Sequence, residues 1–132
     1  MIGLDTNVIL RYLLQDDPQQ APQANHIVDQ VLNDENPGFI SIVTVLELVW
    51  VLRSLLKRTP SEIATHLEHL LAADSLEVQN EQQVFEAAFA LKRGTGEFEE
   101  ALTGALNAWT GCPYTLTFDK RALRMPNFQR IT

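Results

Sequence analysis

The chain has 132 residues, of which 45% are hydrophobic and 20% are charged, and its formal net charge is −7 at pH 7. This length and apolar content predict a single domain over residues 1–132 that buries roughly two thirds of its unfolded surface. The acidic balance argues against binding of nucleic acid through a broad basic surface. It leaves open a nucleic-acid substrate that is met through a bound divalent cation.

Targeting signals and cysteine content suggest where the protein works. No apolar run approaches the roughly 18 residues that span a bilayer. Asp5 and Arg11 interrupt the N-terminal apolar stretch, so we expect no signal peptide. The single cysteine, Cys112, excludes an intrachain disulfide. We therefore expect a cytoplasmic protein in which Cys112 is a small buried apolar residue.

The first seven residues organise the rest of the chain. Residues 2–4 predict a short buried strand that stops at Asp5, and the apolar series after it predicts a helix over 6–14. Ligands of open α/β sheets bind outside the carboxyl ends of the strands, so Asp5 is expected to face a crevice. The alternative is that Asp5 only caps the following helix through its side-chain oxygen.

The middle of the chain alternates between helical and strand patterns. Apolar residues at helical spacing predict helices over 21–32, from about 43 to 56 and over 60–71. Short apolar runs predict strands over 39–42 and 76–78. The last of these helices has a proline at its first position and a glutamate placed for a capping box.

The last third continues the alternation. Asn80 begins a helix that Gly94 ends, and a second helix, with Trp109 among its buried apolar residues, opens near Glu97 and closes at Gly111. A strand over 113–118 follows, and residues 128–131 add an edge strand. Helices that alternate with short strands predict an α/β fold with parallel pairing and crossover connections.

Acidic side chains accompany the predicted strands at Asp5, Glu47, Glu97, Glu100 and Asp119. If the strand order brings them to one end of the sheet, these carboxylates repel one another, and Mg²⁺ or Mn²⁺ would remove the conflict. The acids other than Glu47 also have structural explanations, because glutamates suit a first helical turn and Asp119 suits a cap. Glu47 resists such an explanation, because its helical neighbours are apolar and a buried unpaired acid is costly.

Three motifs, in this order, resemble the PIN-domain ribonucleases. They are Asp5-Thr6-Asn7 after an apolar strand, Glu47 within Val-Leu-Glu-Leu-Val-Trp-Val-Leu, and Leu116-Thr-Phe-Asp119. Within that family the chain resembles the VapC toxins of bacterial toxin–antitoxin pairs, over essentially its whole length. The resemblance implies a three-layer α/β/α sandwich around a central parallel sheet. It also implies Mg²⁺- or Mn²⁺-dependent cleavage of RNA, inhibition by a cognate antitoxin, and a homodimer.

The resemblance also implies roles for individual residues. The acids that it implies as catalytic residues and metal ligands are Asp5, Glu47, Glu100 and Asp119. The residues that it implies as supports for these acids or contacts to substrate are Thr6, Asn7, Glu97 and Thr117. A bound ion would activate the attacking water and offset charge in the transition state.

One departure from the family pattern bears on activity. Glu97 and Glu100 stand where the family usually has aspartates, and each extra methylene moves a carboxylate by on the order of 1.5 Å. Mg²⁺ tolerates little deviation from octahedral geometry, and misplaced reacting groups can cost about 10²-fold in rate. The alternative function is therefore a PIN-fold binding module with a weakened or inactive metal site. A third hypothesis, a phosphotransfer domain that uses Asp5, lacks a glycine-rich phosphate loop.

Overall fold

The computed structural model describes all of residues 1–132 and contains six α-helices and five short strands. The strands are β1 (Ile2–Gly3), β2 (Gly38–Ile40), β3 (Leu76–Val78), β4 (Thr115–Thr117) and β5 (Phe128–Arg130). The helices are α1 (Thr6–Leu14), α2 (Gln20–His26), α3 (Ile42–Trp50), α4 (Pro60–Ala72), α5 (Glu81–Arg93) and α6 (Phe98–Thr110). Helices α2 and α3 continue as the π-helical segments Ile27–Val31 and Val51–Leu55, and a 3₁₀ turn spans Ala122–Arg124.

The strands pair only in parallel, which confirms the predicted α/β class, and they form two separate sheets. The first sheet has the order β1-β2-β3, with Ile2 opposite Gly38 and Ile40 opposite Val78. The second sheet contains only β4 and β5, with Thr115 opposite Phe128. Strand β2 therefore has a neighbour on each side, whereas β1 and β4 each have one.

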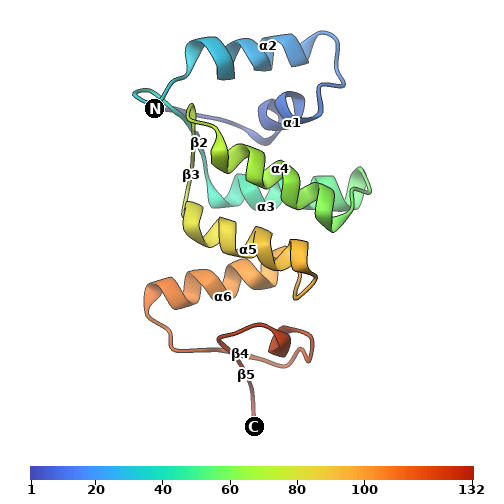
Figure 1. The fold of residues 1–132 in the computed structure, drawn as a ribbon, viewed down its shortest axis with the longest axis vertical. Coiled ribbons are helices and arrows are strands. Elements are labelled where there is room, and N and C mark those ends of the chain that lie inside the picture. Colours follow the sequence, from blue (N-terminus) through green and yellow to red (C-terminus); the bar gives the residue numbers. More distant parts are fainter.

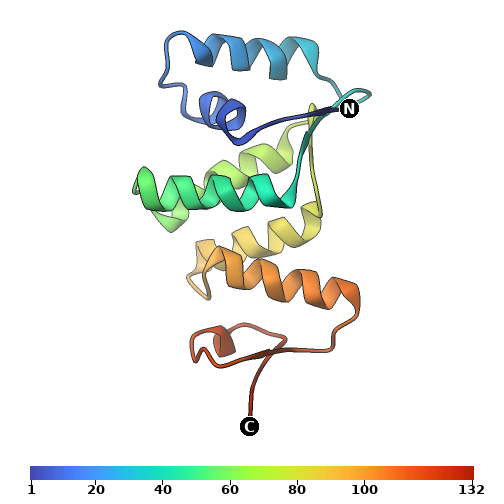
Figure 2. The same cartoon turned by 180° about the vertical axis from the view of Figure 1, so that it is seen from behind.

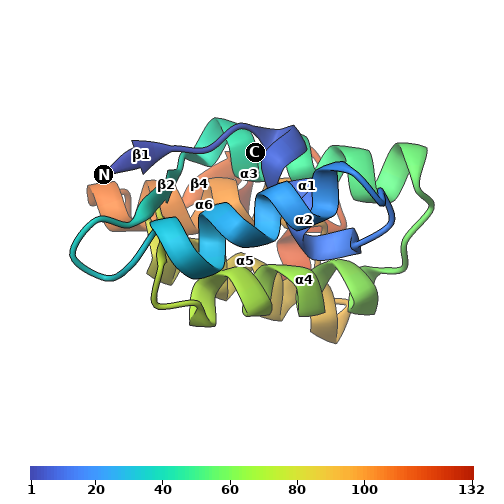
Figure 3. The same ribbon diagram turned by 90° about the horizontal axis from the view of Figure 1, so that it is seen from above.

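The elements are arranged as an elongated stack. Figure 1 shows them one below another in nearly chain order, from α2 at one end to β4 and β5 at the other, and Figure 2 shows the same succession from behind. Seen from above, α4 and α5 run along one side of the stack and α3 along the opposite side (Figure 3). The sheet that contains β1 and the sheet that contains β4 are therefore separated along the long axis.

The hydrophobic core lies between the first sheet and the helices that follow it. It contains 22 buried residues, and the fully enclosed ones include Ile40 on β2, Leu48 on α3 and Ala88 on α5. Each buried leucine or isoleucine stabilises the fold by about 1.5–3 kcal/mol relative to an exposed one. This core holds β2 firmly, while β4 lies outside its centre.

Local sequence signals explain where several helices begin and end. The Ser41 side chain caps α3 by accepting a hydrogen bond from the Thr44 N–H, so β2 ends at Ile40 and not at residue 42 as predicted. Thr59 and Glu62 form the predicted capping box of α4. Gly94 and Gly111 end α5 and α6 in the left-handed conformation, at φ 73° and φ 110°. Asn80 begins α5, but its side chain makes no capping hydrogen bond.

Several burial predictions are wrong. The first strand was predicted to be buried, but Ile2 on β1 is 43% exposed because β1 is an edge strand. Cys112 is exposed, since it follows the end of α6 instead of lying in the core. Trp109, predicted to be buried on α6, is 70% exposed because no element covers that part of the helix. None of the helices is both long enough and apolar enough to cross a membrane.

Candidate metal-binding site

Asp5 is separated from β1 by Leu4 and is the N-cap residue of α1. Its backbone is extended, at φ −87° and ψ 159°, and its Oδ1 accepts a hydrogen bond from the Thr6 N–H at 2.8 Å. The capping role considered for Asp5 is therefore present in the structure. The carboxylate is exposed, and Oδ2 has no hydrogen-bond donor in the chain. Capping thus leaves one oxygen of Asp5 free for a ligand.

The two residues after Asp5 have different surroundings. Thr6 is only 2% exposed, and its Oγ1 is buried without a hydrogen-bond partner. An unpartnered buried hydroxyl costs about 1–3 kcal/mol, so its retention next to Asp5 requires an explanation. Asn7 is exposed and lines a groove between α1 and α2 together with Arg11 and Gln23. Its side chain makes no hydrogen bond to Asp5.

Glu47 projects from α3 into an open groove between α3 and α6. The groove has a volume of about 440 Å³, and its polar lining includes Glu47, Arg53 and Glu99. The Arg53 guanidinium donates to Glu99 at 2.6 Å, which joins the end of α3 to the start of α6. The expectation that Glu47 is buried among apolar neighbours is wrong, because the side chain is exposed while Leu48 and Val49 point to the core.

Glu100 and Asp119 lie near each other in the fold. Glu100 lies in the first turn of α6, and Asp119 follows β4, so two elements bring these carboxyl groups within hydrogen-bonding reach. Burial raises the pKa of Glu100 above its ordinary value of 4.5, and the nearby Asp119 and Glu97 carboxylates raise it further. The positive charge of Arg121 opposes this effect.

The backbone around Asp119 fixes the direction of its carboxylate. The Asp119 N–H donates to Thr117 Oγ1 at 3.0 Å, and Asp119 Oδ1 accepts from the Arg121 N–H at 2.9 Å. The Arg121 guanidinium lies 4.0 Å from the same oxygen, although its side chain is largely exposed. Thr117 therefore supports Asp119, the position at which the family resemblance places a supporting hydroxyl.

Other charged residues in this region take secondary positions. Glu97 precedes α6, is exposed, and makes no side-chain capping bond. It contributes negative charge near Glu100. The sequence did not single out Arg53 and Glu99 as partners, because 46 residues separate them and neither lies in a motif.

The structure brings part of the predicted acid set together. Glu100 and Asp119 meet, with Glu97 near them, but no group of three or more aspartate, glutamate, histidine or cysteine side chains is placed to share one ion. Asp5 belongs to the other sheet, and Glu47 belongs to the α3–α6 groove. Two paired carboxylates still fit Mg²⁺, which commonly binds one or two carboxylates and keeps several waters. Their oxygen-only chemistry suits Mg²⁺ or Mn²⁺ rather than a softer metal.

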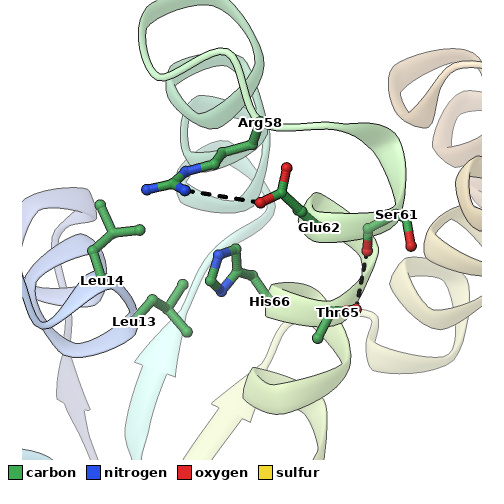
Figure 4. A pocket seen from close by; sticks show the side chains of 7 residues that line it. All are labelled: Leu13, Leu14, Arg58, Ser61, Glu62, Thr65 and His66. Atoms are coloured by element: carbon green, nitrogen blue, oxygen red, sulfur yellow. Dashed lines mark hydrogen bonds and ion pairs between the residues drawn. The ribbon is translucent and has the colours of Figure 1, made fainter.

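A second cavity, lined by α1 and α4, lies apart from these acids. It has a volume of about 360 Å³, and Figure 4 shows Arg58, Glu62 and His66 facing Leu13 and Leu14. Arg58 and Glu62 form an ion pair at 3.8 Å. Burial lowers the pKa of His66 below 6.5, and the Arg58 charge lowers it further. None of the predicted metal ligands lines this cavity.

Comparisons with known proteins add a family assignment to this geometry. The sequence profile of the family described as PIN domain matches residues 2–127, which is nearly the whole chain. The match confirms the expected α/β/α class. No curated protein and no solved structure shows a significant match.

Proposed function

Because the chain belongs to the PIN domain family, we propose that it is a Mg²⁺- or Mn²⁺-dependent endoribonuclease of the VapC toxin type, neutralised by a cognate antitoxin. PIN domains are generally Mg²⁺- or Mn²⁺-dependent nucleases. The RNA substrate and the toxin role go beyond the family assignment. The ordered motifs around Asp5, Glu47 and Asp119 support both.

The pairing of Glu100 with Asp119 is the observation that carries this proposal. Two carboxyl groups from different elements lie near each other; burial raises the pKa of Glu100, and the Asp119 carboxylate raises it further. Such a pair holds a shared proton or a cation, because two bare carboxylates at this separation repel each other. In a nuclease, a cation bound by this pair would serve phosphodiester hydrolysis.

Each residue then has a defined task. Asp119 presents its carboxylate in a direction set by Thr117 and by the Arg121 N–H. Glu100 supplies the second carboxylate, and Asp5 keeps one oxygen free at the end of β1. When bound, a divalent cation supplies water activation and charge neutralisation for phosphodiester hydrolysis. Arg121 lies close enough to the acids to contact an RNA phosphate.

A binding module on the same fold is the second candidate. The separation of Asp5 and Glu47 from the Glu100–Asp119 pair favours it, as do the two glutamates that replace aspartates. In that case the acids bind metal weakly, and the working surface is apolar. An antitoxin would insert an apolar helix and a basic side chain near the acids in either case.

Cleavage of RNA separates the two candidates. The purified chain, free of antitoxin, is incubated with structured RNAs and Mg²⁺ or Mn²⁺, beside Asp5→Asn and Asp119→Asn. We expect cutting that leaves 5′-phosphate and 3′-hydroxyl ends, is lost in both variants, and persists in Asp34→Asn, which alters an exposed loop acid. Cutting that survives a chelator, or that the site variants retain in full, would contradict the proposal.

Glu97→Asp and Glu100→Asp test the departure from the family pattern. If the longer side chains misplace the cation, the double variant should cut faster by up to about 10²-fold. An unchanged rate would mean that the fold already accommodates both glutamates.

A further inference from the structure

A cavity between α5, α6 and the residues around the start of β5, which we call the α5–α6 groove, contains none of the predicted metal ligands. Its volume is about 290 Å³, and half of its lining residues are hydrophobic. The Phe128 ring can enter it because Gly104 of α6 has no side chain: an added Cβ would meet the ring at 2.6 Å. Pockets for small organic groups begin at roughly 300 Å³ and combine apolar walls with a few polar groups. The groove therefore has the size and the chemistry to hold one planar ring.

One face of α5 places an aromatic ring between two opposite charges. Glu86, Phe89 and Arg93 all line the groove, and their separations of three and four residues put them on the same face of the helix. Because an α-helix rises about 1.5 Å per residue, Glu86 and Arg93 lie roughly 10 Å apart along the axis. The groove thus has a hydrogen-bond acceptor at one end, a cation at the other and a ring between them.

The ring and the cation have no other partners that would occupy them. Phe89 is 50% exposed, and neither Phe89 nor Phe128 pairs with another aromatic ring. The Arg93 guanidinium lies 5.5 Å from the centroid of the Phe89 ring and forms no ion pair, whereas the neighbouring Lys92 pairs with Glu68 at 3.2 Å. An arginine without an acidic partner, in a chain of net charge −7, is available to bind an anion such as a phosphate.

Hydrogen-bonding groups reach the groove from both of its walls. Asn127 adopts the left-handed conformation, at φ 72°, and its carbonyl accepts a hydrogen bond from the Thr115 N–H at 2.6 Å, which holds the residue beside the groove. Its side-chain amide makes no hydrogen bond within the chain, and Glu86 accepts only a long one, from Gln82 Nε2 at 3.4 Å. A carboxylate only accepts hydrogen bonds, whereas an amide both donates and accepts. Together they can recognise the edge of a ring that carries an amino group.

The turn between α5 and α6 connects the groove to the candidate metal site. Arg93 and Thr95 line the groove on one side of this turn, and Glu97 ends it beside Glu100. Met125 lines the groove as well and packs on Gly96 in the same turn. The cationic end of the groove therefore adjoins the acids, whereas the Glu86 end lies two turns farther back along α5, which packs directly on α6 (Figure 1).

We propose that the α5–α6 groove binds one unpaired nucleotide of the RNA substrate, next to the bond that is cut, and favours a base with an amino group. This inference rests on the proposed function. The base stacks on Phe89, its amino group donates to Glu86, and its phosphate pairs with Arg93. Uracil is disfavoured, because it presents a carbonyl oxygen to the Glu86 carboxylate where cytosine presents an amino group. A nucleotide fits this groove better than an apolar helix does, because it supplies both a ring and an anion.

Binding of RNA in the presence of a chelator tests the groove without nuclease activity. Fluorescence anisotropy of a short labelled oligocytidylate reports the affinity. Phe89→Ala should weaken binding by roughly 5- to 100-fold, the effect of losing one base stack, and Phe89→Tyr should restore it. Phe85→Ala is the matched control and should leave binding unchanged, because Phe85 is 49% exposed one turn earlier on α5 but does not line the groove.

Salt dependence and base preference test the two ends of the groove. Arg93→Gln should reduce the slope of log Kd against log salt by about 0.7, the value for one phosphate contact on a single strand. Lys92→Gln should leave the slope unchanged, because Lys92 pairs with Glu68. Oligocytidylate should bind more tightly than oligouridylate, and Glu86→Gln, which also donates, should reduce this difference. Equal binding of the two oligomers by the parent, or equal slopes for Arg93→Gln and Lys92→Gln, would overturn the proposal.

A second variant and a free nucleotide complete the test. Ala105→Phe fills the groove without removing a wall, so it should weaken binding even if Phe89→Ala fails to fold. Binding like that of the parent in Ala105→Phe would overturn the proposal and leave the groove to a protein partner. Free cytidine monophosphate should compete only weakly, and competition as tight as that of the oligomer would show a mononucleotide site instead. A parent that binds RNA through the groove but never cuts it removes the nuclease proposal alone. A parent that cuts RNA, with unchanged binding in the groove variants, removes the groove proposal alone.

Discussion

Strands β2 and β4 have the same length and opposite surroundings. Each has three residues with an apolar member, and each pairs only in parallel. Strand β2 lies between two neighbours, and Ile40 is fully buried. Strand β4 has one neighbour, and its central Leu116 is 56% exposed. Short parallel strands thus take their stability from the number of neighbours and from the covering helices, which the apolar pattern alone does not state.

Truncation of the central side chains should show the largest difference between the two strands. Ile40→Ala leaves a cavity in the core and should lower the free energy of unfolding by about 2–5 kcal/mol. Leu116→Ala, measured where light scattering shows a monomer, should change it by no more than about 0.5 kcal/mol. Urea denaturation of both variants measures these changes. An equal loss in the monomeric Leu116→Ala protein would show that β4 is covered within the chain.

The hydroxyls that adjoin the two aspartates allow a second comparison. Thr6 Oγ1 is buried without a hydrogen-bond partner, whereas Thr117 Oγ1 accepts a hydrogen bond from the Asp119 N–H. Thr6→Val should raise the free energy of unfolding by up to about 1 kcal/mol, because it removes an unsatisfied group of similar shape. Thr117→Val should lower it by about 0.5–1.5 kcal/mol through the lost hydrogen bond.

Thermal or urea unfolding, paired with RNA cleavage, completes this comparison. If Thr6 serves the site, Thr6→Val should raise the free energy of unfolding and lower the rate of RNA cleavage. A stability loss in Thr6→Val would indicate that its hydroxyl has a partner in solution. An unchanged cleavage rate would leave Thr6 with a structural role only.

The sequence predicted local structure well because local chemistry determines it. The Thr59–Glu62 capping box and the terminal Gly94 and Gly111 act within one turn of the chain, so their residue types are sufficient. The prediction of burial was wrong for Ile2 and Trp109, because exposure depends on which distant element covers a side chain.

The predictions for the candidate site divide in the same way, into those that local sequence supports and those that depend on tertiary packing. The aspartates at strand ends were found from spacing, and Asp5 does follow β1 as predicted. The pairing of Glu100 with Asp119 required the tertiary packing of α6 against the β4 region, and the contact between Arg53 and Glu99 gave no sequence signal. Sequence thus identifies candidate ligands, whereas the sheet arrangement decides which of them meet.

Neutralisation of Glu100 should give the smallest change in the free energy of unfolding. This change should have the opposite sign to that from neutralising Glu99, which pairs with Arg53. The raised pKa means that the folded chain binds a proton at Glu100 more tightly than the unfolded chain does. The contribution of Glu100 to stability is therefore full below pH 4.5 and is lost as pH rises through the raised pKa. In metal-free buffer at pH 7, Glu100→Gln should be more stable than the parent by about 0.2–1 kcal/mol.

This gain should fade as the pH falls below 4.5, because the parent carboxyl is then protonated in both states. Glu99→Gln is the matched control from the same helical turn, and it should instead lose up to about 1 kcal/mol at pH 7, because its carboxylate pairs with Arg53. Urea unfolding of the three proteins between pH 3.5 and 7 measures both trends. A gain for Glu100→Gln that persists at pH 3.5 cannot come from repulsion between carboxylates, and equal behaviour of the two variants would mean that Asp119 does not face Glu100 in solution.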